Sequence, residues 1–254
     1  MKLKYLFFEF LLIFLCLVLP PLCTPASQAV PDVPRFGLAS AQSLVIAILL
    51  ALQLNRQLPQ LQSLPQALKR KKAPRFQCIA AATVCFGILM LIYAAVEFGG
   101  LALMKLLNRG DLPAGTRTVT GLWQWLSAIT ALAAGAFYEE CLYRAFLPDI
   151  ALILLAGARE GISGARKGIS GTREAFFLRH EKALTAVTEG ACALLFAFSH
   201  RYLGIPAVIN ALLCGAVLRR CYTKTGRILC GTAAHCCYNL TLLAFASLSA
   251  GTAG

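Results

Sequence analysis

Charged side chains are scarce in this chain of 254 residues. Asp, Glu, Lys and Arg together make up 14% of it, whereas soluble domains average about 25%. Hydrophobic residues make up 58%, and several stretches lack the polar face that a soluble helix would show at helical spacing. The composition argues against a water-soluble enzyme, a nucleic-acid-binding domain and a disulfide-stapled secreted module. It predicts a polytopic membrane protein.

Acidic residues are fewer still, with 11 Asp and Glu against 24 Lys and Arg. The basic residues lie mostly in the gaps between apolar runs, as the positive-inside bias and attraction to anionic lipid headgroups require. We therefore expect membrane lipid and a peptide or protein substrate as partners, and no nucleic acid. The 11 cysteines form no CxxC pair and no Cys/His cluster at zinc-finger spacing. Inside apolar runs such thiols behave as small hydrophobes.

The apolar runs define the candidate spans. The first can be read as a signal peptide, because Ser27-Gln28-Ala29 places small residues at a suitable cleavage position. Glu9 inside this run favours an uncleaved first span, followed by a Pro-rich stretch over 20–34. Residues 1–37 form this N-terminal segment, 38–121 the following membrane helices and 122–250 the predicted catalytic core. The runs cover 6–19, 38–54, 78–98, 122–155, 183–203, 205–218 and 228–248.

The gaps between the runs predict the topology. The gaps 55–77 and 219–227 contain basic residues and no acid. Placing both gaps and 157–182 in the cytoplasm gives seven spans, with the N-terminus inside and the C-terminus outside. The run 122–155 exceeds the roughly 20 residues that one span needs, so it protrudes into the cytoplasm or breaks near Pro148 to give an eighth span. The predicted fold class is an all-α transmembrane bundle of seven or eight spans.

A seven-residue repeat occupies the gap 157–182. Three consecutive copies read GAREGIS, GARKGIS and GTREAFF. Two glycines in each of the first two copies oppose a stable helix, so we expect a duplicated cytoplasmic loop. A basic strip lying on anionic lipid is the alternative.

Ionisable residues inside apolar spans mark functional sites by default. Glu140 and Arg144 stand at i and i+4 in the favoured order for an ion pair, and Glu139 points about 100° away from Glu140 on an α-helix. We therefore assign Glu140 as the anchored acid and Glu139 as the free base. Three further acids, Glu9, Glu97 and Glu189, have no other candidate polar residues nearby in the sequence. We expect them near the membrane–water interface or in structural pairs.

Two later segments supply imidazoles. His200 ends the stretch Phe196-Ala-Phe-Ser-His, and His235 and Asn239 share one helix face at i and i+4. Two polar donors aimed at one point suit a developing oxyanion. A hairpin of 122–155 and 183–203 would hold Glu139 and His200 at one depth, about 25 Å from its turn. His235 matches that depth less well, so its helix must be shifted, tilted or broken.

The order EExxxR, FxxxH, HxxxN on three apolar segments resembles the CPBP family. This family includes the type II CAAX prenyl endopeptidases and bacterial relatives, some of them tied to bacteriocin immunity. The resemblance covers about 122–248. It implies that Glu139 and His200 activate a water for attack on a peptide bond, and that His235 and Asn239 stabilise the oxyanion. Glu140 and Arg144 would shape the site.

The family has also been described as metalloproteases. Glu139, His200 and His235 would suffice as ligands for catalytic zinc. The chain has no HExxH motif and no pair of histidines one turn apart. We favour a metal-free glutamate base and keep zinc as the alternative.

These features predict an intramembrane endopeptidase acting on membrane-associated or prenylated-type peptides, located in a bacterial inner (plasma) membrane. Two alternatives come from other classes. One is a non-catalytic immunity or scaffold protein of the same fold. The other is a proton-coupled transporter, although no inverted repeat links the two halves of the chain.

Overall fold

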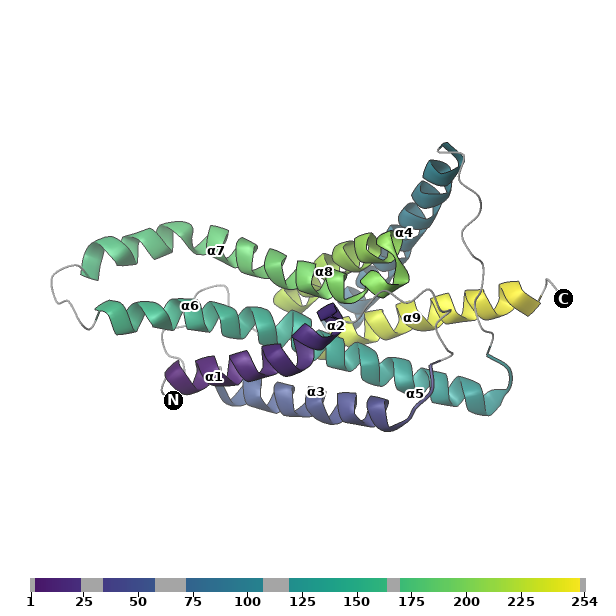
Figure 1. Cartoon of the computed structure of the whole chain (residues 1–254), viewed down its shortest axis with the longest axis horizontal. Helices are drawn as coiled ribbons and strands as arrows, with labels where there is room; N and C mark the ends of the chain where they lie inside the picture. The colour runs from purple at the N-terminus through teal and green to yellow at the C-terminus, as the bar shows by residue number, and fades with distance from the viewer. Residues whose placement is uncertain (1–2, 24–33, 58–71, 107–118, 164–169, 252–254) are drawn as a thin grey trace.

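The described part of the chain is built from helices alone. The computed structural model describes residues 3–23, 34–57, 72–106, 119–163 and 170–251. Figure 1 shows an elongated bundle in which α1 begins and α9 ends at opposite ends. The predicted all-α fold class is confirmed. The elements are α1 (Leu3–Ile13), η1 (Phe14–Val18), α2 (Leu19–Cys23), α3 (Leu38–Gln57), α4 (Arg75–Leu106), α5 (Leu122–Glu139), η4 (Glu140–Phe146), α6 (Leu147–Ser163), α7 (Ser170–Ser199), η5 (Arg201–Leu203), α8 (Ile205–Thr225) and α9 (Ile228–Gly251).

Six helical segments of the described residues are long and apolar enough to cross a membrane. The predicted span over 122–155 is not among them. This region forms a helical rod through α5, η4 and α6, which continues across Pro148. The break that would create an eighth span is therefore not seen in the described residues. The six segments are Lys4–Cys23, Leu38–Asn55, Arg75–Gly100, Glu181–Ser199, Ile205–Thr225 and Ile228–Ser249.

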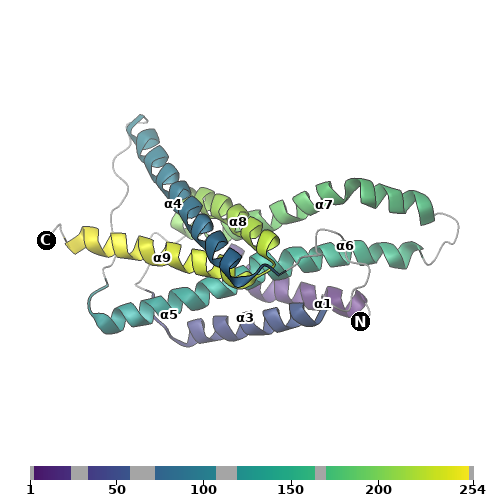
Figure 2. The same cartoon turned by 180° about the vertical axis from the view of Figure 1, so that it is seen from behind.

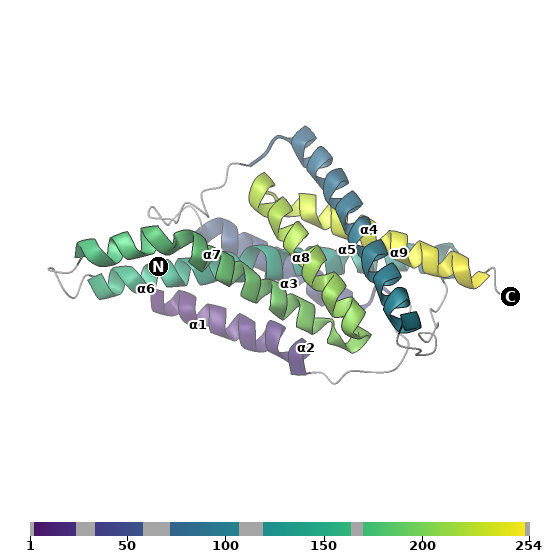
Figure 3. The ribbon, with the colours of Figure 1, turned by 90° about the horizontal axis from the view of Figure 1, so that it is seen from above.

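The α6–α7 hairpin projects from one end of the bundle. The two helices lie side by side and extend beyond the start of α1 (Figures 1 and 3). The predicted loop over 157–182 is thus wrong for the described residues, since 157–163 belong to α6 and 170–182 to α7. Residues 164–169 lie outside the described residues. A glycine inside a helix costs about 1 kcal/mol, and extending an existing helix avoids the penalty of nucleation.

Both acid-free basic gaps end at the same end of the bundle. The Ala73 N–H donates to the Thr225 carbonyl over 2.8 Å, and Arg227 Nε donates to the Ala73 carbonyl over 2.6 Å. Gly226 makes the intervening turn possible, because its left-handed φ of 62° suits a residue without Cβ. The ends of the two gaps thus contact each other. The side of the membrane that they face stays a prediction.

Two π-helical segments each end two residues before a proline. η1 precedes Pro20 and Pro21, and η4 precedes Pro148. A proline has no N–H, and its ring crowds the carbonyl four residues earlier. Membrane helices tolerate the missing hydrogen bond and the crowding by locally widening the turn. The local sequence thus explains why both helices continue with a wider turn instead of ending.

The N-terminal helix packs into the bundle. Leu6 and Val18 are buried in the same apolar cluster as Phe146 and Ile150 of the central rod. Arg201, in the turn after α7, donates from Nη1 to the Leu22 carbonyl near the end of α2. These contacts favour the interpretation of this segment as a first span. The predicted cleavage position at 27–29 lies outside the described residues.

A second apolar cluster forms where α4 crosses α8 and α9. Figures 2 and 3 show α4 running obliquely across both helices. Leu89, Leu218 and Tyr238 are buried there together with several cysteines. Every described cysteine is free, which agrees with their expected role as small apolar side chains. This packing sets the position of α9, which carries the third motif.

Candidate active site

His235 contacts both glutamates of the first motif. His235 Nδ1 lies 3.0 Å from Glu140 Oε1, and its Nε2 lies 3.7 Å from Glu139 Oε2. The Glu140 side chain is 1% exposed and the Glu139 side chain 27% exposed. The two carboxylates therefore flank one imidazole, and only Glu139 reaches solvent-accessible space.

The turn geometry explains how two adjacent acids meet one ring. On an α-helix, adjacent side chains diverge by about 100°, which is the separation expected from the sequence. η4 begins at Glu140, and a π-helical turn has more residues and a smaller angle between neighbours. The assignment of Glu140 as the more deeply held acid agrees with its burial. Its contact with His235, however, was not foreseen.

The contact with Glu140 indicates the tautomer of His235. An ionised carboxylate can only accept hydrogen bonds, so Nδ1 carries the hydrogen. Nε2 then faces Glu139 and the more open side of the site. It acts as an acceptor when the ring is neutral and as a donor when the ring is an imidazolium.

Arg144 links the first motif to the second. Its Nε lies 3.5 Å from Glu140 Oε1, which confirms the predicted ion pair. Its guanidinium carbon lies 3.6 Å from the centre of the Phe196 ring, a cation–π contact. The Phe196 ring in turn lies 4.5 Å, centre to centre, from the imidazole of His200. Within the described residues, none of the three guanidinium nitrogens has a hydrogen-bond partner.

His200 lies directly after α7, and its orientation suits a base. Its Nδ1 lies 2.9 Å from the Phe196 carbonyl. A carbonyl only accepts, so Nδ1 carries the hydrogen and Nε2 carries the lone pair. In the neighbouring turn, burial and then the negative charge of Glu139 raise the pKa of the Tyr202 phenol.

Asn239 lies one helical turn after His235 on α9 and is half-buried. The preceding residue fixes this part of α9 to α8, because Asn210 Nδ2 donates to the Tyr238 hydroxyl over 2.8 Å. The ring of Tyr93 on α4 packs edge-on against Tyr238 at 6.3 Å. The segment that carries Asn239 is therefore anchored from two sides.

A second buried ionic cluster escaped the sequence reasoning. Arg219 Nη1 lies 2.9 Å from Asp149 Oδ1, and Arg219 Nε donates to Glu189 Oε1 over 2.7 Å. The expectation that Glu189 is structurally paired is confirmed. Arg219 was placed in a basic gap, but α8 continues past it and buries it. Its spacing from Gly215 and Tyr222 on one helix stripe was the available signal.

Asp149 met the criterion for a candidate, because it lies inside the run 122–155, yet it was not among the candidates.

Glu9 and Glu97, the other two acids expected near the interface or in structural pairs, lie outside this cluster. Glu9 accepts a hydrogen bond from Gln53 Nε2 on α3, which agrees with structural pairing. Glu97 is half-buried on α4.

The proposed zinc ligands do not form a metal site in this geometry. Among the described residues, no three His, Cys, Asp or Glu side chains are placed to hold one metal ion. Glu139 and His235 approach each other at 3.7 Å, but His200 does not complete a group of three at metal-binding distance among the described residues. The choice between a metal-free glutamate base and zinc stays a prediction.

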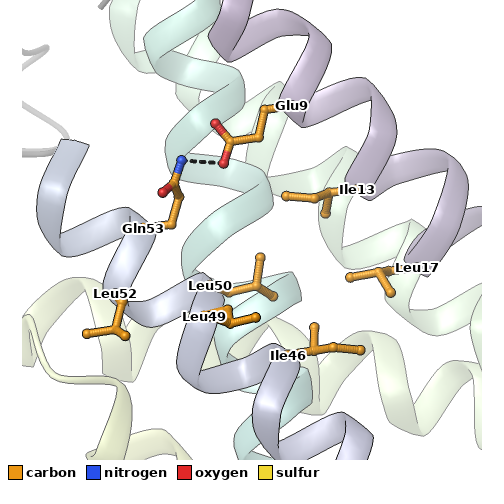
Figure 4. A pocket seen from close by; sticks show the side chains of 8 residues that line it. All are labelled: Glu9, Ile13, Leu17, Ile46, Leu49, Leu50, Leu52 and Gln53. Atoms are coloured by element: carbon orange, nitrogen blue, oxygen red, sulfur yellow. Dashed lines mark hydrogen bonds between the residues drawn. The ribbon is translucent and has the colours of Figure 1, made fainter.

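The described residues also form a cavity of about 340 Å³ between α1, η1 and α3 (Figure 4). Glu9 and Gln53 close its polar end, and the other walls are apolar. None of its lining residues belongs to the glutamate–histidine site. The lining residues are Glu9, Ile13, Leu17, Ile46, Leu49, Leu50, Leu52 and Gln53.

The fold and site define a class: a polytopic membrane protein with acids, imidazoles and an amide on three helices of its core. Residues 121–241 match the family model described as type II CAAX prenyl endopeptidase Rce1-like, so this part of the chain is similar to that protease family. The resemblance inferred from the three motifs is confirmed, and with the apolar helices it identifies an integral membrane protein. No curated protein and no solved structure matches the chain.

Proposed function

We propose that this chain is an intramembrane endopeptidase that hydrolyses a peptide bond in a membrane-associated or prenylated-type peptide. The observation that supports this most is the convergence of Glu139 and Glu140 on His235. Ionisable groups are expensive within a membrane, and here three of them contact one another across two helices. The match to a protease family supports the reaction class.

The two glutamates have different roles in this proposal. Glu139, at 27% exposure, can reach a water molecule, whereas Glu140, at 1%, serves as a fixed anion. Glu139 would accept one proton from the attacking water and later pass it to the leaving amine, while the Nε2 lone pair of His200 would accept a hydrogen bond from the same water. General-base catalysis of this kind contributes typically 10²–10⁴-fold in rate.

His235 and Asn239 would stabilise the tetrahedral oxyanion. His235 Nδ1 is occupied by Glu140, so the oxyanion must receive its hydrogen bond from Nε2. That atom donates only in the imidazolium form. Removing one oxyanion donor costs about 10²–10³-fold in kcat in well-studied hydrolases.

The test is cleavage of a membrane-anchored reporter peptide by the purified chain in proteoliposomes. We expect Glu139→Gln and His200→Ala each to lower kcat by about 10²–10⁴-fold. Glu97→Gln is the matched control, because it neutralises a half-buried acid on another helix. Cleavage retained by both site variants would contradict the mechanism. If the Glu139→Gln variant still binds the reporter peptide and shields it from an added protease, the chain would instead be a binding-only protein.

A further inference from the structure

The carbonyl of Arg144 receives a hydrogen bond from outside its own helix. Pro148 follows four residues later and has no N–H to offer this carbonyl. An unpaired backbone carbonyl inside a membrane is strongly unfavourable. Arg219 Nη1, from α8, donates to it. Arg219 thus gives the Arg144 carbonyl a donor that does not belong to its own helix.

Arg219 is itself held by two acids. Asp149 on α6 and Glu189 on α7 both contact its guanidinium, and the Tyr222 hydroxyl donates to Asp149 Oδ2 over 3.1 Å. The Arg219 side chain is 7% exposed and Asp149 is fully buried. Charge-assisted hydrogen bonds from a planar guanidinium fix both position and orientation.

The same backbone carries the first motif. Arg144 belongs to η4, and its side chain contacts Glu140 and the Phe196 ring, while Glu140 contacts His235. We propose that Arg219 is a positioning residue for the reaction. By holding the Arg144 carbonyl, it keeps η4 in its wide turn, and so keeps Glu139 and Glu140 directed at one imidazole. This inference rests on the proposed endopeptidase function.

The kinetic test compares Arg219→Gln with Arg220→Gln in the full chain. Arg220 is the adjacent residue and is exposed, so its variant makes the same charge change without touching the network. We expect Arg219→Gln to lower kcat on the order of 100-fold, as small misplacements of reacting groups do, with KM unchanged. The kcat of Arg219→Lys should lie between those of the wild type and Arg219→Gln, because an ammonium group keeps the charge but lacks the planar geometry of the guanidinium. Wild-type kcat in Arg219→Gln would overturn the proposal.

A spectroscopic test separates this proposal from the function on which it rests. The chain has three histidines, so the ¹⁵N-imidazole spectrum of the labelled protein is simple. We expect the His235 Nδ1 resonance to shift in Arg219→Gln and to stay in place in Arg220→Gln. A shift in a chain without protease activity would support positioning and contradict the function. An unshifted resonance in an active chain would overturn positioning alone.

A second variant covers the case in which Arg219→Gln does not fold. Pro148→Ala gives residue 148 an N–H, which can pair with the Arg144 carbonyl without Arg219. The double variant Pro148→Ala/Arg219→Gln should then fold, but its segment would relax toward an α-helix and its kcat would stay low. Full recovery of kcat in the double variant would show that Arg219 only stabilises the fold, and would overturn the proposal.

Discussion

Gly231 shows how tightly single residues define the site. A Cβ at this position would lie 2.9 Å from Glu140 Oε2, closer than real contacts allow. Glu140 cannot easily move away, because His235 and Arg144 hold it. Glycine on α9 thus lets the third-motif helix approach the buried acid.

We expect Gly231→Ala to lower the proteolytic activity strongly and to change the free energy of unfolding only slightly. The substitution gains about 1 kcal/mol of helix propensity, while overpacking costs about 1–3 kcal/mol, so the net loss of unfolding free energy is at most about 2 kcal/mol. The displaced Glu140 should disturb His235 directly. Peptide cleavage and thermal unfolding of the purified variant measure the two effects.

Gly190→Ala on α7 is the control for this prediction. No atom lies within 4 Å of the Cβ that it would add, so it should gain helix propensity without a clash. Equal activity in both glycine variants would contradict the tight contact at Glu140.

At the scale of elements, α1 to α2 behave as a structural part of the bundle. Leu6 and Val18 are buried against the central rod, and Arg201 donates to the Leu22 carbonyl. Removal of this segment would expose that apolar surface and leave Arg201 without its backbone acceptor. Packing of this kind is not expected of a leader peptide that is discarded.

We therefore expect residues 3–23 to remain in the mature protein. Intact-mass measurement of the chain purified from membranes, with an affinity tag at the C-terminus, checks this directly. A mass corresponding to a start after Ala29 would show that the segment is a cleaved signal peptide.

At the scale of the whole molecule, the backbone bonds from Ala73 to Thr225 and from Arg227 to Ala73 bring two basic gaps together. Positively charged gaps of a membrane protein face the cytoplasm. We expect this end of the bundle to be cytoplasmic. The N-terminus would then also lie in the cytoplasm.

Labelling with a membrane-impermeant maleimide tests this orientation. In right-side-out vesicles, Lys72→Cys and Lys224→Cys should add no labelling above the wild-type background, and both should add it once the membrane is permeabilised. Thr120→Cys, two residues before α5, is the control for the opposite side. All three residues are exposed. Labelling of Lys72→Cys and Lys224→Cys from opposite sides would contradict the fold.

The sequence by itself determined the class of this protein and the members of its candidate site. Apolar runs, acid-free gaps and the Glu140–Arg144 spacing are properties of short segments, and so is the i, i+4 relation of His235 to Asn239. A helix presents these features whatever its neighbours are. The same locality explains the predictable error at 157–182, where glycine content alone does not stop a helix that has already begun.

Only the tertiary structure decided which groups meet. That His235 contacts both Glu139 and Glu140, and that Arg219 binds Asp149 and the Arg144 carbonyl, depends on how far each helix is rotated and shifted along its neighbours. Those offsets are set by packing along entire helices, such as the crossing of α4 over α8 and α9. No single segment contains that information, because the free energy that fixes it is spread over all the contacts between helices.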